Sequence, residues 1–309
     1  MSLKNKISSN LMLAPMAGVT DKPFRQMVRL FGNHILWTEM IAASALVRGS
    51  NPTKKMMDLS NENGPIVIQL VGNNPDEMAQ AAQMAEDAGA YWIDINMGCP
   101  VKKLISNMSG SALMGNADLA CQIVEKVKSS ISLPLTVKTR LGLTAQSINV
   151  SDFAKSLENA GADGIIIHGR TKEQGYSGHA DWDTIGNVKK QASVPVFANG
   201  DIVSQETLAD CQSKTIADGF LIGRGMLGRP WLLSLLDGNN RTFDVAQIIL
   251  NHYHLLLEYY GKKGLFVARK HLMWYASGYE GVADFRRKLC TETDEREVKK
   301  MIKEFFGGR

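Results

Sequence analysis

LTVKTRLGLTAQSINVSDFAKSLENAGADGIIIHGR, residues 135–170, holds two strand-like runs with a helical pattern between them. The runs are residues 135–140 and 164–170, and both are rich in β-branched side chains, whereas apolar residues recur at helical spacing across residues 150–162. A strand, a helix and a second strand in this order form a unit in which the two strands are parallel. This stretch therefore predicts a parallel sheet covered by helices.

The same alternation recurs along most of the chain. Amphipathic stretches separate eight apolar runs, which occupy residues 11–15, 35–40, 66–72, 92–96, 135–140, 164–170, 195–200 and 219–225. Eight strand and helix repeats over about 225 residues are the number and size expected of a (β/α)8 TIM barrel. The alternative is a doubly wound sheet, but no G-x-G-x-x-G phosphate loop follows the first run. We therefore predict an α/β protein with a TIM barrel over residues 1–240.

The pattern changes near residue 241. Residues 244–264, 265–279 and 296–306 have helical spacing, and no strand-like run lies between them. The segment LDGNNRT, residues 236–242, has the composition of a loop and marks the boundary. We predict a small all-helical domain over residues 241–309.

Composition excludes several classes of protein. The chain is 44% hydrophobic and 21% charged, and it has no apolar run near the roughly 18 residues that a membrane span needs. The N-terminal residues lack the apolar segment of a signal peptide, so we expect a cytoplasmic protein. Its four cysteines are far apart, which argues against a disulfide framework and against a metal site.

Positive charge is concentrated toward the C-terminus. Residues 242–309 hold 12 Lys and Arg against 9 Asp and Glu, so this fifth of the chain carries three of the four excess charges. A polyanionic partner would favour such a surface, although a solvated helical face has the same signature.

A residue that apolar packing does not select stands near the carboxyl end of every strand-like run. These residues are Met16, Gly18, Glu39, Gln69, Asn96, Lys138, Arg140, His168, Arg170, Asn199, Asp201, Gly223 and Arg224. In a barrel these ends converge on one rim, where active sites are built, and the loops after strands seven and eight commonly hold a phosphate group. The set predicts a functional site at this rim.

A cysteine stands on the turn after the fourth run. The strand pattern of YWIDINMGCPVKKL, residues 91–104, stops at Asn96, and Cys99 lies between Gly98 and Pro100. A lone cysteine is most often a small buried hydrophobe. Its place at a strand end beside Asn96 instead predicts a thiol that faces the rim.

Two further rim residues suggest a cofactor. Lys138 lies inside a strand pattern, where its ammonium needs an anion or a carbonyl group. Together with His168 it would suit a flavin, which needs a cation near the ring edge that becomes negative on reduction. The alternative is a structural ion pair between Lys138 and Asp94. Gln69 would suit the pyrimidine edge of a flavin or a nucleobase, and a structural amide is the alternative.

Seven segments resemble the tRNA-dihydrouridine synthases, and most of all the bacterial B-type subgroup. They follow in order from residue 11 to residue 288, and they read LMLAPMAGVTDKPFR, IDINMGCPVKKL, VKTRLG, IIIHGRTKEQGY, VFANGDI, LIGRGMLGRPW and ARKHLMWY with a later FRR. The resemblance implies a TIM barrel that binds FMN, NADPH as the reductant, and a uridine of the tRNA D-loop as the substrate. It also implies a C-terminal helical domain that binds tRNA. We expect a monomer.

The resemblance also implies roles for individual residues. Cys99 matches the family's catalytic proton donor. The implied FMN contacts are Pro15, Met16, Ala17, Gln69, Lys138, His168, Asn199, Gly200, Asp201, Gly223 and Arg224. The implied uracil contacts are Asn96, Lys138, Arg140 and Tyr176. Leu143 departs from the family pattern, which has an aromatic residue at this position, so the shape of the pocket wall is open.

In the implied reaction, hydride passes from FMNH2 to C6 of uracil, and Cys99 gives a proton to C5. The base must leave its stack to reach such a pocket, so backbone anchors are expected nearby. The candidate anchors are Lys102 and Lys103 beside the thiol, and Lys262, Lys263, Arg269, Lys270, Arg286, Arg287 and Lys288 in the helical part, with Trp274 and Tyr275 between them.

Two other functions fit parts of the pattern. One is an FMN-dependent barrel oxidoreductase that acts on a free pyrimidine or another small molecule, which would not need the basic helical region. The other is an RNA-binding protein without catalysis, which would not need a flavin.

Overall fold

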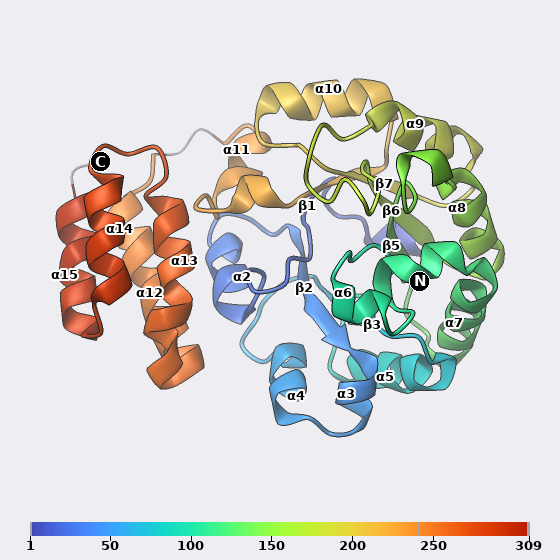
Figure 1. Cartoon of the computed structure of the whole chain (residues 1–309), viewed down its shortest axis with the longest axis horizontal. Helices are drawn as coiled ribbons and strands as arrows, with labels where there is room; N and C mark the ends of the chain where they lie inside the picture. Colours follow the sequence, from blue (N-terminus) through green and yellow to red (C-terminus); the bar gives the residue numbers. More distant parts are fainter. Residues whose placement is uncertain (1, 240–241, 308–309) are drawn as a thin grey trace. The chain divides into compact units, whose positions relative to one another are not determined.

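The structure is a computed structural model that describes residues 2–239 and 242–307, with the backbone alone at Lys103. Eight parallel strands close into a barrel in chain order, which confirms the predicted TIM barrel (Figure 1). The strands are β1 (Leu11–Leu13), β2 (Ile35–Ala42), β3 (Ile66–Val71), β4 (Ile93–Asn96), β5 (Leu135–Arg140), β6 (Gly164–His168), β7 (Val196–Asn199) and β8 (Gly219–Ile222). Several predicted runs continue past the strand because their last residues belong to rim loops.

Helices alternate with the strands along the chain. In chain order they are α1 (Leu3–Lys6), α2 (Lys22–Arg29), α3 (Ala43–Val47), α4 (Asn51–Met57), α5 (Pro75–Asp87), α6 (Lys102–Ile105), α7 (Ala117–Ser130), α8 (Val150–Asn159), α9 (Trp182–Gln191) and α10 (Gln205–Thr215). The 3₁₀ turns η1 (Gly110–Gly115) and η2 (Ala145–Ser147) lie in the loops after β4 and β5. The sequence analysis did not predict α3 and α4.

Local signals in the sequence start the longer helices. The Asn74 side chain accepts hydrogen bonds from two backbone N–H groups at the start of α5, and Pro75 takes the first helical position. Asn116 caps α7, and Ser204 caps α10 in the same manner. Because these caps satisfy backbone donors that the helix itself leaves unpaired, the helix starts are encoded locally.

The barrel interior is apolar at its base. Trp37 of β2 and Trp92 before β4 meet edge to face, with ring centroids 5.4 Å apart, and both are fully buried. The other buried residues of this cluster are Leu3, Met12, Ala14, Ile35, Val67, Ile166, Phe197 and Leu221. A large apolar core of this kind makes the barrel a rigid support for side chains at the rim.

The chain divides into two compact units. One consists of residues 1–21 and 33–223, and the other of residues 22–32 and 224–309. The second unit contains α2 and the later elements η3 (Arg224–Met226), α11 (Leu232–Leu236), α12 (Val245–Tyr260), η4 (Gly261–Lys263), α13 (Gly264–Tyr275), α14 (Val282–Thr291) and α15 (Glu295–Phe306). The predicted limit between residues 240 and 241 lies outside the described residues and stays a prediction.

The second unit has a core of its own. Tyr253 of α12, Leu272 of α13 and Ile302 of α15 are among its buried residues. Phe24 of α2 belongs to the same packing, because its ring lies 5.8 Å from His252 and 5.9 Å from His271. The predicted helical character of this part of the chain is thus present, with α14 as an additional helix.

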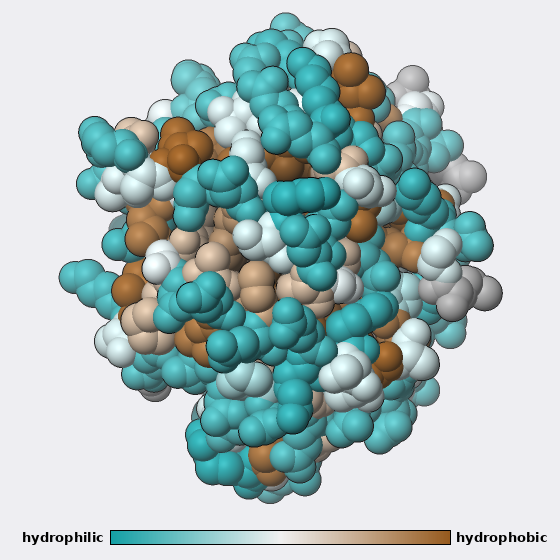
Figure 2. All heavy atoms as spheres, turned by 90° about the vertical axis from the view of Figure 1, so that its right-hand side faces the viewer, coloured by the Kyte–Doolittle hydropathy of each residue, from teal (hydrophilic) through white to brown (hydrophobic). Residues whose placement is uncertain are grey.

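The surface is polar over the face shown in Figure 2, where hydrophilic residues predominate and hydrophobic ones are scattered between them. Across residues 2–239 and 242–307, no helix has the length and apolar character that crossing a membrane requires.

Candidate active site

Strand register brings predicted site residues together at the carboxyl ends of four neighbouring strands. Asn96 of β4 is opposite Lys138 of β5, and two residues further along β5 Arg140 is opposite His168 of β6, which is opposite Asn199 of β7. These residues form two successive rows at the rim, as the polar strand ends predict.

The turn that carries Cys99 is held on both sides. The Asn96 Oδ1 atom accepts hydrogen bonds from the backbone N–H groups of Gly98, at 3.1 Å, and Cys99, at 2.9 Å. On the other side the Ser111 N–H donates to the Cys99 carbonyl oxygen at 3.1 Å. Gly110 has a φ of +60°, and a Cβ there would lie 2.9 Å from the same carbonyl oxygen. The half-buried thiol of Cys99 thus sits on a closely packed turn.

A buried carboxylate lies beneath this turn. Asp94 is completely buried in β4, and its Oδ2 accepts from Trp37 Nε1 at 3.1 Å and from Gln69 Nε2 at 2.6 Å, while its Oδ1 accepts from Thr136 Oγ1 at 2.7 Å. Burial raises the pKa of Asp94 to about 6, and the three donors together with the charge of Lys138 oppose that rise. Gln69 Oε1 in turn accepts from Asn96 Nδ2 at 2.9 Å.

Lys138 does not pair directly with this carboxylate. Its Nζ donates to Asn199 Oδ1 at 2.9 Å, and Asn199 Nδ2 donates to the Leu221 carbonyl oxygen of β8. Burial and the charge of Arg140 lower the pKa of Lys138 to about 8, whereas the nearby Asp94 and Cys99 raise it. An ammonium has three N–H donors, and the bond to Asn199 uses one of them.

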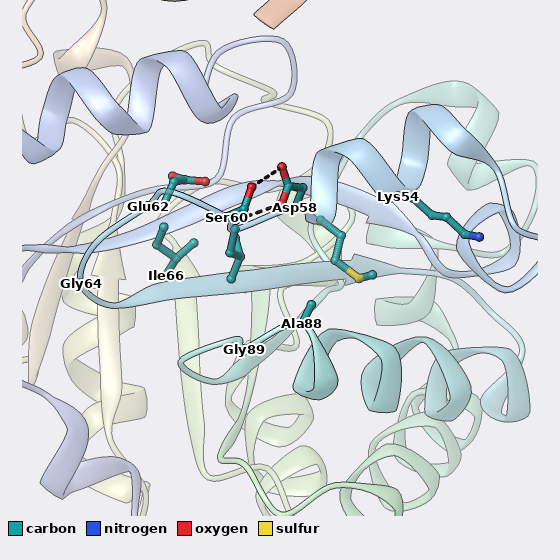
Figure 3. Close-up of a pocket in the computed structure, with 10 residues that line it drawn as sticks. Lys54, Asp58, Ser60, Glu62, Gly64, Ile66, Ala88 and Gly89 are labelled. Atoms are coloured by element: carbon teal, nitrogen blue, oxygen red, sulfur yellow. Dashed lines mark hydrogen bonds between the residues drawn. The ribbon is translucent and has the colours of Figure 1, made fainter.

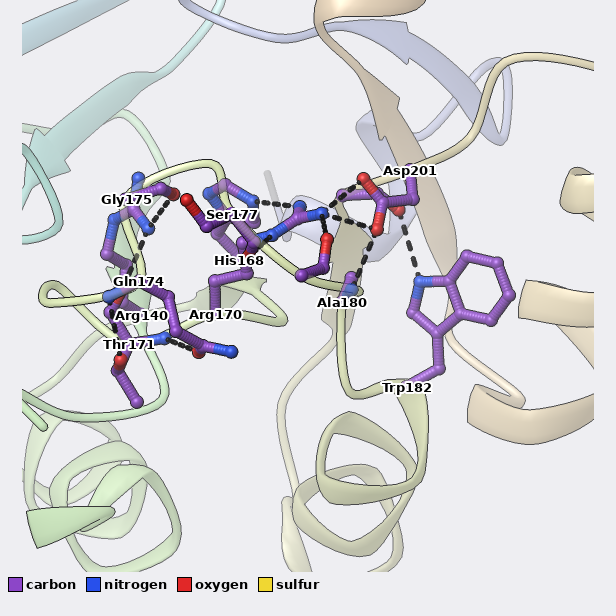
Figure 4. A network of polar contacts seen from close by, with 12 residues as sticks. Arg140, His168, Arg170, Thr171, Gln174, Gly175, Ser177, Ala180, Trp182 and Asp201 are labelled. Carbon is purple, nitrogen blue, oxygen red and sulfur yellow. Dashed lines mark hydrogen bonds and ion pairs between the residues drawn. The ribbon is translucent and has the colours of Figure 1, made fainter. Parts of the chain in front are cut away.

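Arg140 braces two rim loops. Its Nε donates to the Gly98 carbonyl oxygen at 2.8 Å. One terminal nitrogen donates to the carbonyl oxygens of Thr171, at 3.0 Å, and Gly175, at 2.8 Å, as Figure 4 shows. The guanidinium is buried, and it lies 5.8 Å from the ring of Tyr176. Tyr176 is exposed, so its ring is accessible beside the guanidinium. Arg140 therefore connects the cysteine turn to the loop after β6.

Arg170 organises the other half of the network in Figure 4. It is buried, and its terminal nitrogen donates to both carboxylate oxygens of Asp201, at 2.6 and 2.7 Å. A second nitrogen lies 3.3 Å from His168 Nε2. Because a guanidinium can only donate, a hydrogen bond at this contact needs the lone pair of His168 Nε2.

Asp201 is a special backbone position. It has a φ of +59°, and its carboxylate also accepts from the Ala180 N–H at 2.7 Å. Gly200 precedes it with a φ of +122°, and a Cβ there would lie 2.9 Å from Ala180 Cβ and 3.0 Å from His168 Cδ2. Gly200 and Asp201 are therefore needed for packing within the loops after β6 and β7.

The other predicted cofactor residues follow β1 and β8. Pro15 and Met16 are half-buried and Ala17 is exposed, and the Met16 carbonyl oxygen accepts from Val19 and Thr20. Gly223 ends the first unit, with the Met16 sulfur 3.7 Å from the position its Cβ would take. Arg224 opens η3 in the second unit, where its side chain is exposed.

Sequence reasoning missed two organising residues. Asp94 was considered only as an ion-pair partner of Lys138, and Arg170 only as one of the polar strand ends. The available signal was position, because Asp94 stands two residues before Asn96 and alternate strand residues share a face. The partners of Asp94 come from other strands and those of Arg170 from β6 and the loops after β6 and β7, so they could not be inferred from this spacing.

A second pocket, of about 500 Å³, lies elsewhere on the barrel (Figure 3). Its lining includes Ile66 at the start of β3 and Gly89 after the end of α5, together with Lys54, Asp58, Ser60 and Glu62. These elements belong to the amino-terminal face of the barrel, where sequence features usually serve stability. We therefore place the candidate active site at the opposite rim.

The helical unit corrects one predicted RNA contact. Tyr275 is buried, and its hydroxyl lies 3.1 Å from His252 Nδ1, so it was wrong to expect this ring on the surface. Arg287 and Lys288 are exposed and pair with Asp284, while Arg269 donates to the Glu292 carbonyl oxygen. Among the described residues of the chain, no group of three His, Cys, Asp or Glu side chains could hold a metal ion.

Solved structures share the fold. Histamine dehydrogenase from Rhizobium sp. 4-9 superimposes with a TM-score of 0.60 at 14% identity, over 80% of this chain and 49% of that one. A structure of 2-naphthoyl-CoA reductase with 2-naphthoyl-CoA superimposes with a TM-score of 0.59 at 13% identity, over 74% of this chain and 50% of that one. At such identities the similarity extends to the fold alone.

Sequence relatives are much closer. A probable tRNA-dihydrouridine synthase of Rickettsia bellii (strain RML369-C) is 40% identical over 97% of this chain and 96% of its own length. The tRNA-dihydrouridine synthase B of Pasteurella multocida (strain Pm70) is 39% identical over 98% of this chain and 93% of its own. The sequence profile of the family described as dihydrouridine synthase (Dus) matches residues 12–306. With the resemblance of its motifs thus confirmed, the chain belongs to the dihydrouridine synthase family.

Proposed function

We propose that this protein reduces the C5=C6 bond of a D-loop uridine in tRNA, with FMN as cofactor and NADPH as reductant. The observation that carries the proposal is the turn of Cys99, which Asn96 holds in the same strand layer as Lys138. A thiol and a cation at neighbouring strand ends suit a reaction that adds a proton on one side and needs negative charge stabilised on the other.

The residues present fit a flavin. Lys138 offers an ammonium that Asn199 holds at the rim and that has further N–H donors for a ligand. A cation at this position suits the electron-rich edge of the flavin ring, and His168 adds an imidazole ring at the end of the next strand. When bound, FMN supplies the hydride that C6 of uracil receives. The remaining contacts we propose are Pro15, Met16, Ala17, Gln69, Asn199, Gly200, Asp201, Gly223 and Arg224.

Cys99 acts in this proposal as an acid. Addition at C6 leaves negative charge that is shared between C5 and the C4 carbonyl of uracil, so C5 must take a proton. The neutral thiol supplies it, and the turn fixed by Asn96 determines where the sulfur projects. Arg140 and Tyr176 are the proposed partners of the base, together with Asn96 and Lys138.

Binding of tRNA would turn the uridine out of its stack, which costs a few kcal/mol and needs contacts to the neighbouring backbone. Exposed Lys102, at the start of α6, stands three residues after the thiol and is a proposed phosphate contact. We also propose that the helical domain, residues 241–309, binds tRNA, and that the protein acts in the cytoplasm as a monomer without a metal ion.

The test is the variant Cys99→Ala compared with Cys121→Ala, which removes a thiol from the barrel helix α7. Both proteins should be yellow, and NADPH should bleach the flavin absorbance of both. Only Cys99→Ala should lose dihydrouridine formation on tRNA that lacks the modification. Normal turnover by Cys99→Ala would disprove the proton-donor role. Reduction of free uracil at the same rate as tRNA would favour a small-molecule oxidoreductase instead.

A further inference from the structure

A chain of hydrogen bonds runs from the barrel interior to the cysteine turn. It starts at Asp94 Oδ2, which accepts from Gln69 Nε2 at 2.6 Å, and continues from Gln69 Oε1, which accepts from Asn96 Nδ2 at 2.9 Å. It ends at Asn96 Oδ1, which accepts from the N–H groups of Gly98 and Cys99. Three strand residues in β3 and β4 thus connect a fully buried carboxylate to the backbone of the thiol residue.

The chain has a direction, and the acceptor at its first member and the N–H donors at its last both require that direction. A side-chain amide can present either its oxygen or its NH2 group to a neighbour, because the two ends are nearly equal in shape. A carboxylate, in contrast, only accepts, so Gln69 must turn its NH2 group toward Asp94. The Gln69 oxygen then faces Asn96, which must donate to it from its own NH2 group. The Asn96 oxygen is left for the two backbone N–H groups.

The opposite direction would break the turn. If Gln69 were reversed, its NH2 group would face Asn96, and Asn96 would present its NH2 group to the N–H groups of Gly98 and Cys99. Donors would then face donors, and the N–H groups of this half-buried turn would lose their acceptor, which costs up to about 1–3 kcal/mol for each group that water does not reach. Neither amide contains anything that selects the observed direction on its own.

We propose that Asp94 is a positioning residue, which supports the turn of Cys99 by holding the Gln69 and Asn96 amides in the orientation that the N–H groups of the turn require. Two further contacts hold Asp94 in place, because Trp37 and Thr136 also donate to its carboxylate. Its complete burial separates it from water that could replace any of these donors. The catalytic meaning of this role rests on the proposed function of Cys99, whereas the structural claim does not.

Three variants distinguish the effect of breaking this hydrogen-bond chain from a general loss of stability. Asp94→Ala removes the acceptor at its start. Asp94→Asn keeps it, because an amide oxygen can take the place of Oδ2 while the new NH2 group donates to the Thr136 hydroxyl, which can also accept. Thr136→Val is the matched control, since it removes a hydrogen bond to the same carboxylate but leaves the bond to Gln69.

The measurement is amide hydrogen exchange at Gly98 and Cys99 in the full-length protein. Asp94→Ala should raise exchange at these two amides by at least about tenfold, the factor that loss of one ordinary hydrogen bond represents. Asp94→Asn and Thr136→Val should stay within about threefold of the unmodified protein. Equal exchange at these amides in Asp94→Ala and Thr136→Val would overturn the proposal.

If Asp94→Ala does not fold, Gln69→Met interrupts the same chain at its second member, and the same rise in exchange is expected. Unchanged exchange in Gln69→Met would equally overturn the proposal. Turnover of tRNA distinguishes this inference from the proposed function. Faster exchange would support the chain and unchanged exchange would refute it at any level of turnover, whereas normal turnover in Cys99→Ala would refute the proton donor and leave the chain standing.

Discussion

Gly110→Ala should damage the cysteine turn more than its backbone strain alone explains. Gly110 has a φ of +60°, and an alanine in this region costs about 1–2 kcal/mol. The new Cβ would also lie 2.9 Å from the Cys99 carbonyl oxygen and 3.3 Å from Cys99 Cβ. The first contact is with backbone, so the turn itself must move, and overpacking of this kind costs about 1–3 kcal/mol more. We expect the free energy of unfolding to fall by about 2–5 kcal/mol in total.

Gly89→Ala is the control for the cost of placing an alanine at a positive φ. Gly89 has a φ of +87°, but no atom lies within 4 Å of the position its Cβ would take. Urea unfolding of both variants should therefore show about 1–2 kcal/mol of loss in Gly89→Ala, and the difference between the two measures the contact at Cys99.

Catalytic turnover is a second measurement of the effect of Gly110→Ala. Moving the thiol by a fraction of an ångström should lower turnover of tRNA on the order of tenfold in Gly110→Ala, because misplacement by 1 Å can cost about a hundredfold. Gly89→Ala should keep normal turnover. If the two variants match in both stability and turnover, the close contact between Gly110 and the cysteine turn is wrong.

Three other predictions follow from buried charged groups. The pKa of Lys138 is lowered to about 8, so its charge is present below pH 8 and lost above it. The rate of flavin reduction by NADPH should therefore fall as the pH rises through about 8, and this fall should be absent in Lys138→Met. Burial, helped by the charge of Lys270, lowers the pKa of His252 to about 3, so its contribution to stability is fully present above the pKa of the unfolded state, near 6.5, and is lost as the pH falls toward 3. Urea unfolding at several pH values should show a loss on the order of 5 kcal/mol, and a smaller loss in His252→Phe. Arg170→Lys should lower the free energy of unfolding by about 3 kcal/mol, measured by urea unfolding, because one ammonium replaces the separate guanidinium nitrogens that donate to Asp201 and to the Ser177 carbonyl oxygen.

The barrel could be predicted from the sequence because strands and helices leave distinct periodic patterns. The eight apolar runs overlap β1 to β8, and polar residues of β4 to β7 meet at the carboxyl ends of these strands. Short elements such as α3 escaped prediction, since five residues are too few to show a helical period.

Hydrogen-bond partners could not be predicted in the same way. Gln69 was expected to contact a flavin, yet its amide bonds to Asp94 and Asn96, and these contacts depend on how neighbouring strands are aligned. Asp201 was likewise expected at the cofactor, and its carboxylate is held by Arg170 from the preceding strand loop. Alternation along a strand assigns a residue to a layer, whereas its partner depends on closure of the whole barrel. Whether either side chain also contacts a flavin stays a prediction.

The loops that Arg140 holds can change in sequence and remain attached to it. Its guanidinium reaches the main chain at Gly98, Thr171 and Gly175, and every residue type supplies a carbonyl oxygen. Substitutions in these loops can therefore alter the shape and charge presented to a bound nucleic acid without removing an acceptor from the brace. Selection of a different target nucleotide can then evolve separately from the apparatus that performs the reduction.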